Sequence, residues 1–390
     1  MPLGFLAAGV RAGIKEQGED LALIFSDRPA SAAGVFTRNV VKAAPVLVDA
    51  KRLPRTTARA VVVNSGNANS CTGDAGLQDA LRMGREVANR LGVAEEDVLV
   101  ASTGIIGERL PMEKITDGIE RAASSLRRDG GADAARAIMT TDTRPKEAGV
   151  ELSLGGANVK VGAIAKGAGM ICPNLATMLT FITTDAAVAP GQLQGCLAQS
   201  VEKSFNCLTV DGDSSTNDSV IILANGAAGS RLIDSRIPDL DGFQEALDFV
   251  AASLAKQIAQ DGEGATKLIQ ITVQGARSFE EARQVAKTVA NSPLVKTAMF
   301  GRDPNWGRVL AAAGRAGVDF DPTAVDLSFG PVPLVRGGEP LDFSVAQAQE
   351  VLSKPETNVL IKIGQGPGSA TVWTCDFSYD YVRINAEYHT

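Results

Sequence analysis

Short apolar runs alternate with longer amphipathic segments along the chain. The short runs are partly β-branched and end at polar or glycine-containing turns, which is typical of buried strands. They are Leu21–Phe25, Ala33–Thr37, Val61–Val63, Val98–Ala101, Val295–Phe300 and Asn358–Ile363. The tail Ala370–Ile384 alternates apolar and polar positions, so an extended conformation with one buried face is predicted there as well.

The longer segments repeat their apolar residues at helical spacing. The clearest helix is predicted to begin at Thr72 and to run to Leu91, where Gly92 ends it. Further helices are predicted at residues 111–126, 193–203, 241–258, 279–291 and 304–313. For the last of these, Asp303 is expected to cap the helix and Pro304 to take its first position.

Strands that follow one another in runs, with helices between some of them, favour a layered α/β or α+β fold over an all-β one. The length of 390 residues allows two or three domains. No repeat or low-complexity linker marks a boundary, and the one weak candidate is Ala276–Glu280, where Ser278 precedes a predicted helix.

Charge and composition describe an ordinary soluble protein. Acidic residues outnumber basic ones by 45 to 38, and no basic stripe suggests a nucleic-acid partner. No segment reaches the apolar length of a membrane span, and no basic leader precedes the short apolar run at the start. The cysteines are odd in number and lack a C-x-x-C pattern, so free thiols in the cytoplasm are expected. No glycine-rich loop follows a phosphate-binding template.

Histidine limits the chemistry most sharply, because the chain has only His389, next to the last residue. A Ser-His-Asp or Cys-His triad would have to draw on the chain end. A zinc site would lack both a second histidine and a close cysteine pair, so no metal is predicted. If the protein performs nucleophilic catalysis, its base is expected not to be an imidazole.

An N-terminal threonine supplies a nucleophile and a base together, since its α-amine has a pKa of roughly 7.7–8.0. An internal threonine gains such an amine only when the chain is cut directly before it. The segment 166–185 offers a candidate at Ala176–Thr177, where a glycine-rich approach and a Pro-Asn turn lead into a predicted strand. Taken alone, this pair also fits an ordinary strand, because threonine is favoured there.

The sequence KGAGMICPNLATMLTFITTDA around this pair closely resembles the cleavage signature of the ornithine acetyltransferases, also called glutamate N-acetyltransferases. The resemblance extends over essentially the whole chain. Its motifs are GFLAAGVRAGIK, AAGVFTRNVVKAAPV, VVVNSGNANSCTG, ASTGIIGE, MTTDT, DGDSSTNDS, GRDPNWGR and RINAEYHT.

The resemblance implies that Thr177 attacks the Ala176 carbonyl and that the chain is cut into residues 1–176 and 177–390. The new N-terminal Thr177 would take acetyl from N2-acetylornithine as an ester and pass it to glutamate, with its own amine as base, in arginine biosynthesis. The implied fold is an αββα-type sandwich with a smaller C-terminal α/β domain, typical of N-terminal-nucleophile enzymes. The two fragments would stay associated, as a heterotetramer of two of each.

Further site residues also come from the resemblance, motif by motif. Thr103 and Gly104 would form the oxyanion hole that acyl transfer requires. Substrate contacts are implied for Thr140, Lys166, Thr177, Glu263, Asn385 and Thr390. Lys166 suits an amino-acid carboxylate and Glu263 an ammonium group of ornithine, whereas Thr140 competes with its neighbours Thr141 and Thr143. Asn217, Asp218 and the loop at Trp306 match the family's motifs without a role that the sequence defines.

Two alternatives stay open at this level. A self-processing amidase or aminopeptidase of the same architecture would release the acyl group to water. A metabolite-binding protein would leave Ala176–Thr177 uncut. No cofactor is predicted, and the sequence does not decide whether acetyl-CoA is a second acetyl donor.

Overall fold

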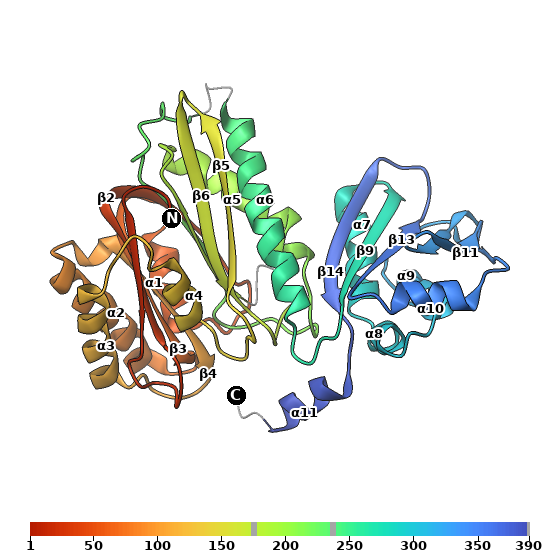
Figure 1. The fold of residues 1–390 in the computed structure, drawn as a ribbon, viewed down its shortest axis with the longest axis horizontal. Helices are drawn as coiled ribbons and strands as arrows, with labels where there is room; N and C mark the ends of the chain where they lie inside the picture. The colour runs from red at the N-terminus through yellow and green to blue at the C-terminus, as the bar shows by residue number, and fades with distance from the viewer. Residues whose placement is uncertain (173–177, 235–238, 388–390) are drawn as a thin grey trace.

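The computed structural model describes residues 1–172, 178–234 and 239–387 (Figure 1). In this part of the chain, eight strands form a first sheet with the order β4-β3-β2-β8-β7-β6-β5, and β1 pairs with β2. The strands are β1 Phe5–Val10, β2 Leu21–Phe36, β3 Arg55–Asn67, β4 Val98–Ile105, β5 Lys146–Leu154, β6 Ala157–Lys166, β7 Leu179–Thr184 and β8 Ser219–Ala224.

Strand β2 divides this sheet into two arms. Its first half pairs with β1 and β3, whereas its second half, Ser31–Phe36, pairs with β8. The pairing register of β2 with β3 shifts between Phe25 and Ala30 and again before Ala32, as expected where a bulge bends a strand. The two strands predicted at Leu21–Phe25 and Ala33–Thr37 are therefore one strand, interrupted in pairing rather than in conformation.

Alternate residues of the strands belong to different apolar cores. Leu21 and Leu23 of β2 pack with helices α1 Ala44–Arg52, α2 Gly73–Leu91 and α3 Met112–Ser124. Ala22 and Ile24 point the other way, into a core shared with Phe181 of the second arm. Helix α4 Gly131–Ala137 contributes to this shared core.

The second arm repeats the pattern. Ile221 and Leu223 of β8 face the shared core, whereas Val220 and Ile222 face α5 Pro190–Lys203 and α6 Asp239–Gln260. The order helices, arm, arm, helices is an αββα sandwich, as the resemblance implies and Figure 1 shows. Short 3₁₀ turns at Glu95–Asp97 and Phe205–Cys207 connect elements within it.

A second body follows α6. In the described residues its six strands have the order β12-β11-β10-β13-β9-β14. They are β9 Leu268–Ala276, β10 Asp326–Phe329, β11 Val332–Arg336, β12 Glu339–Pro340, β13 Glu356–Lys362 and β14 Gly368–Cys375. Its other elements are α7 Phe279–Ala290, α8 Pro293–Phe300, α9 Trp306–Gly314, the 3₁₀ turn Pro322–Ala324 and α10 Val345–Leu352. Residues 261–267 connect the sandwich to this second body. The predicted boundary at Ala276–Glu280 therefore falls inside the second body, between β9 and α7.

The last helix, α11 Tyr379–Glu387, leaves the second body and runs back beneath the sandwich (Figure 1). The predicted extended tail Ala370–Ile384 is thus wrong after Cys375. The alternation that predicted it holds through β14, and the chain then turns at Ser378, whose hydroxyl accepts a hydrogen bond from the Asp380 amide at 3.2 Å.

Two further expectations are corrected at helix starts. Val295–Phe300 is helical rather than extended, because Ser292 caps α8 through the Val295 amide and Pro293 takes the first helical position. Helix α9 begins at Trp306 and is capped by Asn305, not by Asp303. In contrast, α2 ends where predicted, with Gly92 in the left-handed region at φ +66°.

Candidate active site

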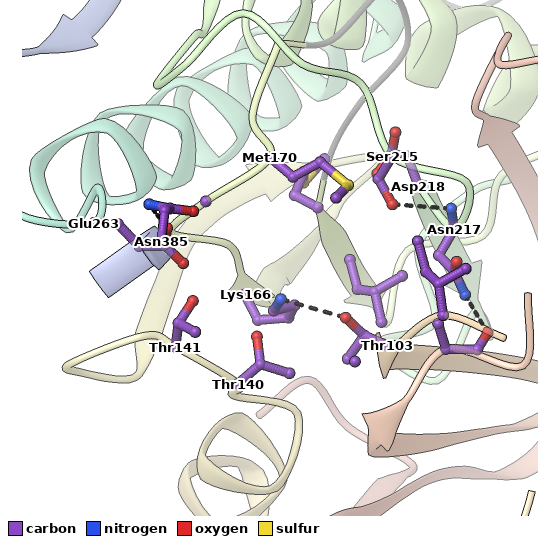
Figure 2. A pocket seen from close by; sticks show the side chains of 16 residues that line it. Thr103, Thr140, Thr141, Lys166, Met170, Ser215, Asn217, Asp218, Glu263 and Asn385 are labelled. Atoms are coloured by element: carbon purple, nitrogen blue, oxygen red, sulfur yellow. Dashed lines mark hydrogen bonds between the residues drawn. The ribbon is translucent and has the colours of Figure 1, made fainter. Parts of the chain in front are cut away.

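A cavity of about 140 Å³ opens where the two arms of the sandwich meet α11 (Figure 2). The residues around it come from segments far apart in the sequence. They are Ala68, Thr103, Gly104, Ile106, Thr140, Thr141, Lys166, Gly169, Met170, Met178, Leu179, Ser215, Asn217, Asp218, Glu263 and Asn385.

The cavity brings together every predicted site residue that the structure describes. These are Thr103, Gly104, Thr140, Lys166, Glu263 and Asn385. Ala176, Thr177 and Thr390 lie outside the described residues. Met178, which directly follows Thr177 in the sequence, lines the cavity.

Strand pairing explains why these residues meet. Lys166 at the end of β6 is opposite Leu179 at the start of β7, and Leu179 is opposite Ser219 at the start of β8. The Asn217 side chain then joins the arms, because its amide donates hydrogen bonds to the Ala68 carbonyl at 2.6 Å and to the Ser102 carbonyl at 2.8 Å. Three polar motifs thereby converge on one edge of the sandwich.

The end of strand β4 at Thr103-Gly104 needs glycine at its second position. Gly104 has φ +133°, and a Cβ atom there would collide with the Gly66 backbone on β3. The Thr103 hydroxyl accepts a hydrogen bond from Lys166 Nζ at 3.3 Å. A hydroxyl that accepts from an ammonium group keeps its own proton to donate, which suits an oxyanion-hole donor.

Lys166 is buried near side chains of opposite charge, Asp142 and Glu263. Burial lowers its pKa, and the negative charge of Asp142 opposes that effect. Burial would raise the pKa of Asp142, but the Lys166 and Lys146 ammonium groups outweigh it and lower that pKa to about 2. Asp142 also accepts hydrogen bonds from Lys146 Nζ at 2.6 Å and from the Gly167 amide at 2.7 Å. The loop that begins at Lys166 is therefore fixed by an ionised carboxylate.

The threonines of the MTTDT motif differ in what they contact. Thr140 and Thr141 both line the cavity, and the Thr140 amide donates to Asp142 Oδ2 at 3.0 Å. Thr143 instead donates through its amide and hydroxyl to the buried Asp261. The structure thus leaves Thr140 and Thr141 available to a ligand.

Glu263 and Asn385 come from opposite ends of the second body. Asn385 on α11 donates from Nδ2 to Glu263 Oε2 at 2.9 Å, and Figure 2 shows the two side chains together on one wall. Gly169 packs so closely beneath Glu263 that a Cβ atom would collide with the carboxylate. The cavity therefore presents an ammonium group, Lys166, and a carboxylate, Glu263, to a ligand.

Sequence reasoning missed the carboxylates behind the site. Asp142 orders the Lys166 loop, and Asp218, which had matched a motif without a role, lines the cavity. The sequence held a signal for both residues. Asp142 lies between two threonines in the polar run 140–143, and Asp218 directly precedes the apolar strand 219–224.

The described residues contain no metal-binding cluster, no disulfide and no helix that could span a membrane. In this part of the chain, histidine, cysteine and acidic side chains form no group of three or more that could hold a metal ion. All five cysteines lie within it and are free thiols. Among its helices, none is both long and apolar enough to cross a membrane.

Known proteins resemble this sequence over nearly its whole length. Residues 6–390 match the family model described as the ArgJ family. The arginine biosynthesis bifunctional protein ArgJ of Symbiobacterium thermophilum is 52% identical, over 100% of this chain and 98% of that one. The protein of the same name from Geobacter sulfurreducens is 51% identical, over 99% of each. A crystal structure of arginine biosynthesis bifunctional protein ArgJ from Bacillus halodurans shares 44% identity, with a TM-score of 0.53 over 54% of this chain and 100% of that chain. This chain belongs to the ArgJ family.

Proposed function

We propose that this chain is a glutamate N-acetyltransferase of arginine biosynthesis, which moves acetyl from N2-acetylornithine to glutamate through an ester on Thr177. The observation that carries the proposal is the cavity itself. It gathers all the described residues to which the resemblance gives a role and reaches Met178, next to Thr177 in the sequence. Relatives of about the same length that are named for arginine biosynthesis support it.

The charges in the cavity suit amino acids as substrates. Lys166 can pair with a carboxylate, and Glu263, held by Asn385, can pair with an ammonium group. The small volume favours one amino acid at a time. The acetyl group must then stay bound to the enzyme after the donor leaves and before the acceptor enters. Ping-pong kinetics are therefore expected.

Acyl transfer places negative charge on a carbonyl oxygen in both half-reactions. The Thr103 hydroxyl, polarised by Lys166, and the Gly104 amide are the donors that we assign to this oxygen. The α-amine of Thr177 serves as base, since the chain carries only one histidine, outside the described residues.

Self-cleavage between Ala176 and Thr177 would leave two interlocked fragments. Strands β7 and β8 of residues 177–390 lie in the middle of the first sheet, between β2 and β6 of residues 1–176. Separating the fragments would break the hydrogen bonds between β2 and β8 and between β7 and β6. We therefore expect the fragments to stay together after the cut. The solved Bacillus halodurans chain is covered completely by 54% of this chain, as a single fragment would be.

Assembly and location follow the family resemblance only. We propose a heterotetramer of two of each fragment, cytoplasmic, with no cofactor. Acetyl-CoA is a co-substrate only if it donates acetyl in the assay below.

The test is the fate of the acetyl group. The purified chain is given N2-acetylornithine carrying a labelled acetyl group, with and without glutamate, and acetylglutamate and acetate are measured by mass spectrometry. The proposal expects acetylglutamate and a strong dependence on glutamate. Acetate as the main product, independent of glutamate, would establish the hydrolase instead. A parallel reaction with labelled acetyl-CoA tests the second donor.

A matched pair of lysines on β6 ties the activity to the cavity. Lys166→Met removes the buried ammonium group, and we expect kcat/KM to fall by at least about 100-fold, as for loss of a charge-assisted contact. Lys160→Met alters an exposed lysine on the same strand, whose ammonium group pairs with Glu151 at the surface, and should retain activity. Equal activity of the two variants would separate the function from this cavity.

A further inference from the structure

Lys146, at the start of β5, is a fully buried lysine to which the proposed reaction gives no role. Its side chain is 0% exposed, and its ammonium group uses all three of its donors inside the protein. Nζ donates to Asp142 Oδ1 and to Asp261 Oδ2, both at 2.6 Å, and to the Arg144 carbonyl at 3.4 Å. Lys146 can therefore act on a ligand only through the groups that it binds.

The first carboxylate, Asp142, fixes the loop that begins at Lys166. Its Oδ1 atom also accepts a hydrogen bond from the amide of Gly167, the residue after Lys166, at 2.7 Å. Strand pairing supports the same arrangement, because Lys146 is opposite Ala165, the residue before Lys166. Lys146 and Asp142 thus hold the end of β6, where the carboxylate of an amino acid would bind.

The second carboxylate, Asp261, fixes the loop that carries Glu263. Asp261 follows the last residue of α6, and its amide donates to the Gln257 carbonyl at 3.1 Å. Its Oδ2 atom accepts a hydrogen bond from the Thr143 amide at 3.0 Å as well as from Lys146. Glu263 is only two residues further along the chain, so its position depends on that of Asp261.

The contacts of the two carboxylates close into a ring. The Glu263 amide donates to the Ala168 carbonyl at 2.9 Å, which joins the second loop back to the first. The members of the ring are Lys146, Asp142, residues 166–168 and residues 261–263. Lys166 and Glu263, the charged groups on two walls of the cavity, therefore belong to one frame (Figure 2). A buried ionic network adds little net stability compared with apolar packing, so its value here is in placement.

We propose that Lys146 is a positioning residue that sets the separation of Lys166 and Glu263, and thereby the length of the amino acid that the cavity accepts. The inference rests on the proposed function, in which Lys166 pairs with the carboxylate of the acetyl donor and Glu263 with its side-chain ammonium group. Two binding groups held at a fixed separation suit one spacing of charges along the substrate. N2-acetyllysine is longer than N2-acetylornithine by one methylene between these charges, so it should react less well.

The test is a competition between these two donors in one vessel. The purified enzyme is given glutamate and equal concentrations of N2-acetylornithine and N2-acetyllysine, and the ornithine and lysine released early in the reaction are measured by mass spectrometry. Their ratio equals the ratio of kcat/KM for the two donors and does not depend on how much of the enzyme is folded. For the natural sequence we expect a preference for the ornithine donor of about 10–200-fold, the usual effect of one methylene.

Two variants open the ring at the same link. Lys146→Met removes the ammonium group and keeps much of the side-chain volume, and the preference should fall at least about 5-fold because the two loops are no longer held at one separation. Asp261→Asn weakens the same link from its other end and should lower the preference in the same direction. The double variant should fall no further than Lys146→Met, since both changes remove one shared contact.

Lys296→Met is the matched control. Lys296 is also a buried lysine, but it belongs to the second body, where its Nζ donates to Thr374 Oγ1 at 2.7 Å. This variant should lose stability and keep the natural preference between the donors, because it leaves the ring intact. The control therefore separates a loosened cavity from a protein that is merely less stable.

Three results would overturn the inference. The natural sequence could accept both donors equally, the Lys146 and Asp261 variants could keep the natural preference, or the Lys296 variant could lose it to the same extent. If Lys146→Met does not fold, the result for Asp261→Asn decides. If neither donor reacts with the natural sequence, the proposed function fails and the inference fails with it, whereas acetyl transfer with an unchanged preference refutes the role of Lys146 alone.

Discussion

Buried lysines occur in both bodies of the molecule, but they differ in what surrounds them. In the second body, Lys267 Nζ donates to the Met299 carbonyl at 2.9 Å and to the Leu352 carbonyl at 2.6 Å. Lys296 there donates to Thr374 Oγ1 at 2.7 Å and to the Cys375 carbonyl. Lys296 thus joins helix α8 to strand β14, and Lys267 joins the ends of α8 and α10 to the start of β9; neither lysine lines the cavity.

In the sandwich, Lys166 faces a cavity, and within the described part of the chain its ammonium group donates one hydrogen bond, to Thr103. Its charge is balanced by Asp142 and Glu263 rather than saturated by carbonyls. The comparison teaches that burial alone does not identify a functional lysine. The distinguishing feature is hydrogen-bonding capacity left open towards a space that a ligand can enter.

The second body nevertheless takes part in the site, through α11. Lys296 binds the chain at Thr374 and Cys375, shortly before α11 carries Asn385 to Glu263. Its contribution is placement, whereas the sandwich supplies the reacting groups. The predictions that follow test this division.

The largest effect is expected at the proposed nucleophile. Thr177→Ala should remain one chain and should transfer no acetyl, because both the hydroxyl and the new amine are lost. Gel electrophoresis and N-terminal sequencing test this, and the natural sequence should give a second chain that begins Thr-Met-Leu-Thr-Phe. Efficient cutting of the variant would contradict the mechanism.

Next in size is the oxyanion donor of the sandwich. Thr103→Ala should lower kcat by about 10²–10³-fold with little change in KM, because the contact is strongest in the transition state. Steady-state kinetics of acetyl transfer measure it. An unchanged kcat would mean that another group holds the oxygen.

A smaller effect is expected for Asn385 on α11, the helix that follows the second body. Asn385→Ala should raise KM about 10-fold or more, since it frees Glu263 from a hydrogen bond to a charged group. Val382→Ala, at an exposed position on the same helix, is the matched control and should change little. A fall in kcat alone, with KM constant, would assign Asn385 to the chemistry instead of placement.

The smallest effect on catalysis is expected for the buried lysine of the second body. Lys296→Met leaves carbonyl and hydroxyl groups without their partner and should lower the free energy of unfolding by about 1–3 kcal/mol. The kcat of the folded variant should stay near that of the natural sequence. Chemical denaturation and kinetics on the same sample measure both, and a large loss of kcat without loss of stability would remove the distinction between the two bodies.

Local sequence predicted much of the sandwich. The strands at Val61–Val63 and Val98–Ala101 and helix α2 with its stop at Gly92 were found, because alternating burial and capping leave a signature within a few residues. Local patterns failed at α8 and α11, where a β-branched run and an alternating tail are helical. Capping and tertiary packing there outweigh strand propensity, which depends strongly on context.

The sequence by itself also determined the chemistry that was available, through one histidine, a motif at Ala176–Thr177 and the family resemblance. Only the tertiary structure decided which of several threonines face the cavity and which carboxylates stand behind Lys166. Thr143 donates to Asp261, and Lys166 lies opposite Leu179, through pairings between residues far apart in the chain. Such pairings depend on strand order and register, which a local pattern of residues does not encode.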